Sequence, residues 1–303
     1  MQRVKERIHY WCEDTASGRC LGSKITVAVL DSGIAFHPDF EGRILSFQDM
    51  TAGRVGAYDD CGHGTHVCGI IGGDGRMSGG KLCGIAPGCR FIVLKVLDRR
   101  GHGTVDAVIR GIRWILRFKD IYQIRIVNIS VGSQPGSDKR SKKRLLEAVE
   151  TLWDAGIVVV AAAGNYGPHC GTVTAPGCCK KIITVGASDD ESGAEIHGKL
   201  CCNYSGRGPT EECVLKPELV APGANICSCN AGFRKWGAQP YIEKSGTSMA
   251  TPIVSGAAAL LLSKYPQMTN VEIKLKFRES CKDLGLPGNQ QGWGLVQIKE
   301  LLQ

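Results

Sequence analysis

The sequence predicts an α/β protein in which a mostly parallel central sheet is covered by helices on both faces. Five short segments are rich in β-branched residues and almost continuously apolar, as expected for parallel strands that are buried on both sides. Segments with helical periodicity separate them, and this alternation of strands and helices is the signature of the fold class. We predict the strands at residues 24–30, 91–97, 124–131, 156–163 and 181–187.

Three helices can be placed from the spacing of their apolar residues. Residues 104–118 and 143–156 carry apolar side chains at intervals of three and four, and Gly156 suits the left-handed position that follows a helix. Residues 250–262 form a third helix that is almost wholly apolar. Because proline lacks the N–H group that a helix interior needs, we expect Pro252 within the first turn of this helix.

The composition indicates a globular domain with its own core. The chain has 303 residues, of which 43% are hydrophobic and 22% are charged, and it shows no internal repeat or linker. We therefore expect residues 1–303 to form a single domain. The net charge of +8 includes a basic run at residues 137–144. No nucleic-acid motif accompanies the run, so we predict a solvated surface there and no nucleic-acid partner.

The fifteen cysteines and the absence of long apolar runs bear on the location of the protein. An odd number leaves at least one thiol unpaired, and no C-x-x-C pattern occurs. No apolar run is long enough for a membrane span, and the N-terminus lacks the apolar stretch of a secretory signal. We expect a cytoplasmic protein that is not in the membrane and whose thiols are mostly free and buried. Secretion is the alternative if the chain is a processed or truncated product.

Polar residues stand at four strand or helix ends. Asp31 follows the first predicted strand, Asn165 follows the fourth, and His63 and Ser248 each begin an apolar helix. Because sites gather at the carboxyl ends of parallel strands, we expect these residues to meet. Alone, each is compatible with a turn or a helix cap. Together they supply the orienting carboxylate, general base, oxyanion donor and nucleophile of an acyl transfer.

The two helix starts favour this chemistry. The positive field at a helix start disfavours the imidazolium form, which leaves His63 as a neutral base. The unpaired N–H groups around Ser248 can stabilise a negatively charged oxygen. His66, three residues after His63, is expected to be structural, because the sequence offers no third ligand near this His-x-x-His pair for a zinc site.

These motifs resemble those of the subtilisin-like serine proteases, the subtilases of peptidase family S8. The motifs are "VAVLDSGI", "GHGTHVCGI", "AAAGN" and "GTSMATP", with further similarity in "GIAP", "SGRGP" and "KPELVAPG". The order Asp, His, Ser differs from the orders in chymotrypsin and in α/β-hydrolases. The resemblance covers residues 22–300 as the catalytic core, leaves residues 1–21 as an N-terminal extension, and implies a three-layer subtilisin-like fold.

The resemblance also implies a serine endopeptidase that hydrolyses polypeptides through an acyl-enzyme. Ser248 would attack the scissile carbonyl, and His63 would take its proton and pass it to the leaving amine. Asp31 would hold the imidazole, while the Asn165 side chain and the Ser248 N–H group would bind the oxyanion. The chemistry implied in this way needs no cofactor.

The specificity cleft is placed by the same resemblance. Residues 101–103 and 130–132 would pair with the backbone of the substrate as two extended segments. Thr174 would lie near the floor of a pocket and favour medium-sized apolar residues, and Val105 and Val131 would line an apolar subsite. The candidate substrate-binding residues are Gly101, His102, Gly103, Val105, Ser130, Val131, Gly132, Ala163, Gly164 and Thr174.

Two features depart from the family pattern. No prodomain-like segment precedes the core, so the chain most resembles the intracellular, prodomain-less type of bacterial member. Residues 72–87 stand where many relatives have a calcium loop and offer Asp74 and Ser78, but also two basic residues. That is a poor set for a cation that takes 6–8 oxygen ligands. Asp39 matches a calcium ligand of relatives, so structural calcium stays open, but we do not predict a metal site.

Two other functions remain open from the sequence. One is a pseudoprotease that keeps the fold for binding, which the presence of all four chemical residues argues against. The other is a redox-responsive or metal-responsive protein, suggested by the cysteines, which could also coexist with protease activity. The physiological substrate and the oligomeric state are not determined by the sequence.

Overall fold

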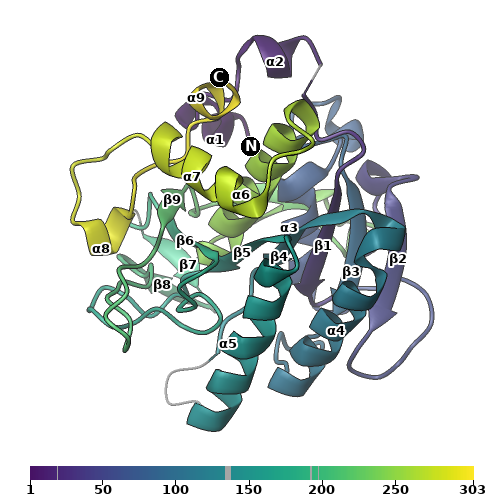
Figure 1. The fold of residues 1–303 in the computed structure, drawn as a ribbon. Coiled ribbons are helices and arrows are strands. Elements are labelled where there is room, and N and C mark those ends of the chain that lie inside the picture. Colours follow the sequence, from purple (N-terminus) through teal and green to yellow (C-terminus); the bar gives the residue numbers. More distant parts are fainter. Residues whose placement is uncertain (19, 134–137, 192, 197) are drawn as a thin grey trace.

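The computed structural model describes residues 1–18, 20–133, 138–191, 193–196 and 198–303, and its centre is a seven-stranded sheet (Figure 1). The strand order is β2-β3-β1-β4-β5-β6-β9, and every neighbouring pair is parallel. The strands are β1 (Thr26–Asp31), β2 (Ile44–Asp49), β3 (Arg90–Lys95), β4 (Ile124–Ile129), β5 (Val158–Ala162), β6 (Ile183–Ala187) and β9 (Leu219–Ala221). The predicted parallel α/β sheet is therefore confirmed.

The five predicted strands are the inner strands of the sheet, and the two strands at its edges were missed. Strands β1, β5 and β6 are buried along their whole length, which explains their continuous apolar sequence. The edge strand β2 is mostly half-buried and carries polar residues, and the other edge strand, β9, has only three residues. Neither pattern stands out in a sequence, because one strand is amphipathic and the other is too short.

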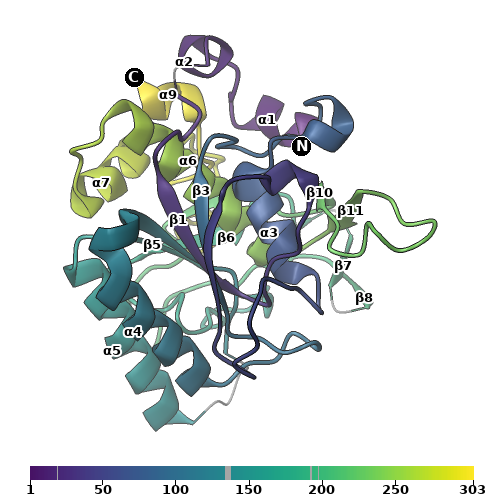
Figure 2. The same cartoon turned by 90° about the vertical axis from the view of Figure 1, so that its right-hand side faces the viewer.

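Helices cover both faces of the sheet (Figure 2). Helices α4 (Val105–Tyr122) and α5 (Lys139–Asp154) pack together on one face, and α3 (His63–Gly72) and α6 (Thr247–Lys264) pack together on the other. The side chains of Thr104 and Asp138 accept backbone N–H groups at the starts of α4 and α5. Gly156 has φ +81° just past the end of α5, as predicted.

Helix α6 is buried along most of its length and begins earlier than the sequence suggested. Because it begins at Thr247, Ser248 lies in its first turn, as expected, but Pro252 is the sixth residue and lies in the second turn. The prediction for Pro252 is therefore wrong, and the carbonyl of Ser248 has no helical N–H partner. Gly256 brings α6 close to its neighbours, since a Cβ there would lie 2.6 Å from the Ile85 Cβ atom.

The remaining elements lie around the ends of the sheet. They are α1 (Gln2–Arg7), α2 (Glu13–Ala16), η1 (Pro38–Phe40), η2 (Arg76–Ser78), β7 (Ala194–Ile196), β8 (Lys199–Cys201), β10 (Ile226–Cys229), β11 (Tyr241–Lys244), α7 (Asn270–Ser280), α8 (Gly288–Gln291) and α9 (Ile298–Leu302). Strands β7 and β8 form one antiparallel hairpin, and β10 and β11 form another. The first and last parts of the chain are joined next to α1 and α9 (Figure 1): the N–H group of Ile298 donates to the carbonyl of Ile8 at 2.8 Å.

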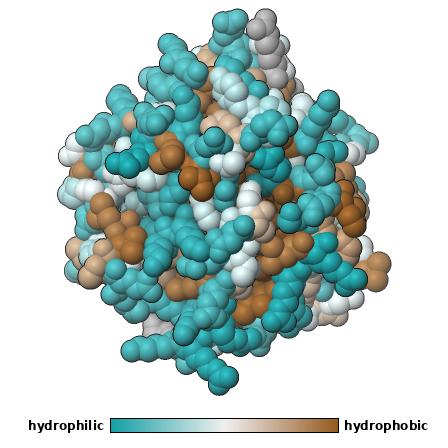
Figure 3. Space-filling view, viewed as in Figure 1, coloured by the Kyte–Doolittle hydropathy of each residue, from teal (hydrophilic) through white to brown (hydrophobic). Residues whose placement is uncertain are grey.

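One face of the molecule is mostly hydrophilic (Figure 3), and most of the cysteines are at least partly exposed. On the face in Figure 3, hydrophilic residues dominate and apolar residues form small scattered groups, and no described helix is long and apolar enough to cross a membrane. All fifteen cysteines lie within the described ranges, and none forms a disulfide. Only five of them are buried, so the prediction of mostly buried thiols is wrong. The buried ones are Cys20, Cys68, Cys89, Cys179 and Cys229.

Candidate active site

The four predicted chemical residues occupy the ends of two strands and two helices. Asp31 is the last residue of β1, and His63 is the first residue of α3. Asn165 is the third residue after β5, and Ser248 is the second residue of α6. Because β1 and β5 are parallel strands of one sheet, Asp31 and Asn165 both lie at its carboxyl edge, which is where such folds place their sites.

Asp31 and His63 form a direct hydrogen bond. The Nδ1 atom of His63 lies 2.7 Å from Oδ1 of Asp31. The Asp31 carboxylate is fully buried, its Oδ1 also accepts the Ser32 N–H group at 2.7 Å, and its Oδ2 has no partner in the described part of the chain. The His63 side chain keeps 23% of its surface exposed. The pair therefore combines a buried carboxylate with an imidazole that substrate can reach.

The loop before His63 is held by Asp59, a residue that the sequence analysis missed. Its carboxylate accepts the N–H groups of Gly62 at 2.7 Å and Thr65 at 2.8 Å, so it caps the start of α3. The Ser32 hydroxyl donates to Asp59 and accepts the N–H group of Gly64. Burial raises the pKa of Asp59, but its hydrogen bonds outweigh burial and lower it overall. The signal was an acidic residue four positions before His63.

Ser248 forms no hydrogen bond with His63 in this conformation, within the described residues. Its hydroxyl donates instead to the backbone carbonyl of Ser130 at 2.7 Å. The hydroxyl therefore points toward the segment that follows β4. The position of Ser248 at the start of α6 exposes it to the unpaired N–H groups and the positive field of that helix.

Asn165 is fixed by Thr247, the residue before Ser248. The Asn165 carbonyl oxygen accepts both the N–H group and the hydroxyl of Thr247, each at 2.9 Å. The Thr247 hydroxyl in turn accepts the N–H group of Gly164. Because both partners are donors, these contacts identify the accepting side-chain atom of Asn165 as Oδ1. They leave its Nδ2 group without a hydrogen bond to any described residue. Nδ2 lies 3.1 Å from the position of a Cβ atom on Gly246, beside the start of α6.

His66 lies one turn after His63 and has a different environment. It is fully buried, and its Nε2 atom lies 2.9 Å from the carbonyl of Ile226 and 3.0 Å from that of Ile242. Burial lowers the pKa of His66 to about 3, so the ring is neutral at pH 7. It joins α3 to the β10–β11 hairpin, in agreement with the structural role that the sequence predicts.

Four of the predicted pocket residues come together. Thr174 is buried, and a Cβ atom on either Gly132 or Gly164 would overlap its hydroxyl oxygen. Thr174 is thus wedged between the segments after β4 and β5, beneath Gly132 and beside Ala163 and Gly164. Its hydroxyl has no hydrogen-bond partner in the described structure. Only glycine at 132 and 164 leaves room for this threonine.

The segment 101–103 folds back on the end of β3. Gly103 forms an isolated antiparallel bridge with Leu97, and the carbonyl of His102 accepts the Asp98 N–H group at 2.8 Å. Val105, at the start of α4, and Val131, after β4, are both half-buried. No hydrogen bond within the described ranges joins residues 101–103 to residues 130–132, so the structure does not pair these two segments with each other.

The residues that could have held calcium have other partners. The Asp74 carboxylate accepts the backbone N–H group of Arg76 and forms an ion pair with its guanidinium at 3.2 Å. The Ser78 hydroxyl donates to the carbonyl of Gly75 and accepts the N–H group of Leu82. The loop is therefore closed by its own hydrogen bonds and carries a positive charge.

Comparison with known proteins agrees with this geometry. The profile of the subtilase family matches residues 22–294. Serine protease AprX of Bacillus subtilis is 41% identical over 266 residues, and Subtilisin Savinase of Lederbergia lenta is 34% identical over 278 residues. The first match covers 84% of this chain and 60% of AprX, so the chain spans less than two thirds of that relative. The second covers 92% of this chain and 90% of Savinase.

A solved structure supports the same assignment. Sphericase superposes with a TM-score of 0.77 at 29% sequence identity, covering 91% of this chain and 92% of its own. The fold, the order of the motifs and the sequence identity to named serine proteases all agree. The chain therefore belongs to the subtilase family of serine endopeptidases.

Proposed function

We propose that this chain hydrolyses internal peptide bonds of polypeptides through an acyl-enzyme formed on Ser248. The observation that carries the proposal is the 2.7 Å hydrogen bond between His63 Nδ1 and the buried carboxylate of Asp31. A carboxylate can only accept, so Nδ1 carries the proton and Nε2 is left as the base. His63 then takes the Ser248 proton, forms an imidazolium that Asp31 stabilises, and donates to the leaving amine.

The first step requires Ser248 to leave its present partner. Its hydroxyl now donates to the Ser130 carbonyl, and rotation about the Cα–Cβ bond would turn it toward His63. Hydrogen bonds of catalytic groups are often loose before substrate binds and tighten in the complex. A substrate strand that pairs with residues 130–132 would compete for this carbonyl, so substrate binding itself would release the nucleophile.

We further propose that Asn165 and the Ser248 N–H group bind the oxyanion. The Asn165 carbonyl is occupied by two hydrogen bonds from Thr247, which leaves its Nδ2 group as a fixed donor. A donor that is already oriented need not reorganise when charge develops on the substrate oxygen. Thr247 would then act as a positioning residue rather than as a catalytic one.

The substrate pocket is proposed between the segments that carry Gly132 and Gly164. Because Thr174 fills the space beneath both glycines, the pocket would be shallow and suit medium-sized apolar side chains. Thr174→Gly should deepen it and raise kcat/KM for a Phe substrate relative to a Leu substrate by about tenfold. Matched fluorogenic peptides that differ at this one residue would measure the ratio. An unchanged ratio would place the pocket elsewhere.

The proposed chemistry uses only side chains and backbone of this chain, and it needs no cofactor. Calcium does not fit the loop at residues 72–87, because Asp74 is paired with Arg76 and Ser78 is bonded to the backbone. We propose no calcium site there. We also propose a reducing, cytoplasmic location, which the fifteen unpaired thiols support. Titration of free thiols in protein taken directly from its native cells would test the location.

Replacement of the nucleophile tests the proposed function. Ser248→Ala should lose labelling by a serine-directed fluorophosphonate and reduce kcat for a peptide substrate by about 10⁶-fold, while the circular dichroism spectrum stays unchanged. The matched control is Ser245→Ala, because the Ser245 hydroxyl accepts the Asn225 N–H group and lies outside the proposed set. A folded wild-type chain that is not labelled would instead indicate a pseudoprotease.

A further inference from the structure

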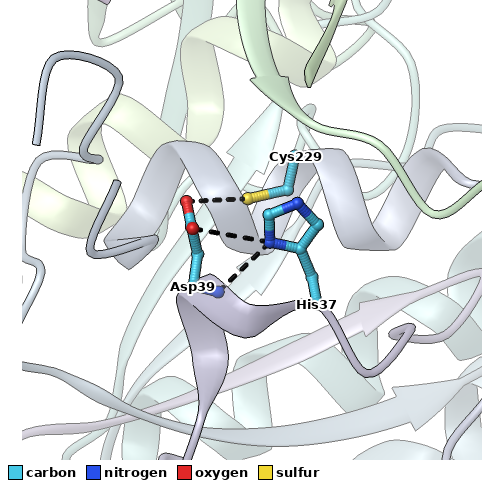
Figure 4. Close-up of side chains that lie close together, drawn as sticks. All are labelled: His37, Asp39 and Cys229. Atoms are coloured by element: carbon cyan, nitrogen blue, oxygen red, sulfur yellow. Dashed lines mark hydrogen bonds and ion pairs between the residues drawn. The ribbon is translucent and has the colours of Figure 1, made fainter. Parts of the chain in front are cut away.

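A second cluster of chemically active side chains lies outside the proposed catalytic set. It consists of His37, Asp39 and Cys229, which point toward one another in Figure 4 and are all buried. His37 Nδ1 lies 3.6 Å from Asp39 Oδ1, and Cys229 Sγ lies 3.6 Å from Asp39 Oδ2. Ligand atoms around a tetrahedral zinc ion are roughly 3.3–3.8 Å apart. One ligand atom from each of the three residues lies within 4.8 Å of the other two, so small shifts would bring all three to a shared metal ion.

The charge of the cluster is not balanced by protein groups. Asp39 has no exposed surface, and within the described part of the chain no Lys or Arg side chain forms an ion pair with its carboxylate. Its imidazole neighbour does not supply the charge, because His37 Nδ1 accepts the Asp39 backbone N–H group and only Nε2, which faces the Pro240 carbonyl, carries a proton. The carboxylate is held by neutral donors, the N–H group of Gly75 and the hydroxyl of Tyr241. A buried carboxylate without a cation is unfavourable.

The histidine ring is oriented as a metal ligand. His37 Nε2 lies 3.0 Å from the carbonyl oxygen of Pro240, which can only accept, so Nε2 carries the proton. Nδ1 is then unprotonated and faces Asp39, where it accepts a long 3.2 Å bond from the backbone N–H group. Metal-binding histidines commonly donate their other N–H group to a backbone carbonyl in this way. The long bond to Nδ1 is the contact that a metal ion would replace.

The donor atoms select the kind of metal. Calcium takes 6–8 oxygen ligands, whereas this cluster offers one nitrogen, one sulfur and a carboxylate. A thiolate and an imidazole together favour zinc among the common divalent ions. We propose that His37, Asp39 and Cys229 bind one Zn²⁺ ion. The two anionic ligands balance its charge, and the Tyr241 hydroxyl, 2.9 Å from Asp39 Oδ2, lies beside the fourth position.

The proposed ion would join segments that are far apart in the sequence. His37 and Asp39 flank the start of η1, whereas Cys229 ends β10. The β10–β11 hairpin leads directly into α6, which carries Ser248. Because the site is closed, metal binding would be coupled to folding of these segments. An ion that binds only the folded chain raises its stability according to its concentration relative to Kd.

The first experiment uses the inactive Ser248→Ala chain, which cannot digest itself, kept under reductant and stripped of metal with a chelator. Zn²⁺ should bind at one ion per chain and raise Tm by about 5 °C at a free concentration one hundred times Kd. Co²⁺ in its place should produce the charge-transfer absorption of a cobalt–thiolate bond. This spectrum needs no variant at the site, so it does not depend on how a mutant folds.

The second experiment changes the sulfur ligand. In the same background, Cys229→Ser keeps a hydroxyl that can still donate to Asp39, and it should lose both the cobalt–thiolate absorption and the zinc-dependent rise in Tm. Cys227→Ser, two residues earlier on β10, is the matched control and should keep both. The proposal is overturned if zinc does not raise Tm, if Cys229→Ser responds like its parent, or if only Ca²⁺ stabilises the chain. None of these readouts depends on catalysis.

Discussion

Two His–Asp pairs in this molecule have opposite tautomers. His63 directs its Nδ1 atom at the Asp31 carboxylate at 2.7 Å, so Nδ1 carries the proton and Nε2 is a free base. His37 places Nδ1 3.6 Å from the Asp39 carboxylate and accepts a backbone N–H group there, while Nε2 donates to a carbonyl. The same two residue types thus provide the proposed base in one pair and a proposed metal ligand in the other.

Exposure separates the two regions further. The His63 side chain is 23% exposed, whereas the side chains of His37 and Asp39 have no exposed surface. Around the first pair, the Asn165 Nδ2 group has no hydrogen bond to a described residue. Around the second, both Asp39 oxygens accept several protein donors. Unused donors beside an accessible base indicate a reactive site, and satisfied buried groups indicate a structural one.

The largest difference between the two His–Asp pairs is expected when the aspartate of each pair is replaced. Asp31→Asn should lower kcat/KM by about 10⁴-fold, the size known for this change in other serine proteases, because the amide favours the wrong tautomer of His63. Asp39→Asn should leave kcat/KM within about threefold of wild type when measured well below Tm. Steady-state kinetics on one peptide substrate compares them. Equal losses in both variants would show that the two pairs do not have separate roles.

A smaller loss of activity is expected when the proposed oxyanion donor, the Nδ2 group of Asn165, is removed. Asn165→Ala should lower kcat by about 10²–10³-fold with little change in KM, because the lost hydrogen bond forms only in the transition state. Thr247→Val should lower kcat by about tenfold, since it removes one of the two hydrogen bonds that hold the Asn165 carbonyl and leaves the Nδ2 donor in place. Substrate titrations of kcat and KM measure both variants. A change confined to KM would contradict the assignment of an oxyanion donor.

The smallest effect concerns pH and the buried histidines. The pKa of His66 is about 3 in the folded chain and 6.5 for an ordinary histidine. As pH falls below 6.5, the unfolded chain therefore binds more protons than the folded chain does. The contribution of neutral His66 to stability is therefore full above pH 6.5 and is lost as pH falls toward 3. The loss should be on the order of 1 kcal/mol per pH unit. Burial lowers the pKa of His37 too, so it acts in the same direction.

The variant His66→Gln tests the predicted direction of this pH dependence of stability. The glutamine amide can donate to the carbonyls of Ile226 and Ile242 but does not titrate in this range. The variant should lose less stability than wild type between pH 6.5 and pH 4.5, as measured by urea denaturation of the Ser248→Ala chain. Parallel pH curves for the two chains would mean that His66 is not responsible.

The sequence determined the inner sheet and predicted which residues carry the proposed chemistry. Buried parallel strands are apolar throughout, so β1, β3, β4, β5 and β6 were recognisable from local composition. The order of Asp31, His63 and Ser248 and their place at element ends pointed to one chemistry, because together they supply a carboxylate, a base and a nucleophile, although each alone is compatible with a turn or a helix cap. The family match agrees with that interpretation.

Only the tertiary structure decided how distant groups pair. The Ser32 bond to Asp59, the Ser248 bond to Ser130 and the Thr247 bonds to Asn165 depend on where separate loops meet. Cys229 and Asp39 are 190 residues apart, and no local pattern could join them. The local sequence encodes the periodicity and propensity of each element. Hydrogen bonds between loops depend instead on how the elements pack in three dimensions, and the spacing of the elements along the chain carries no information about that packing.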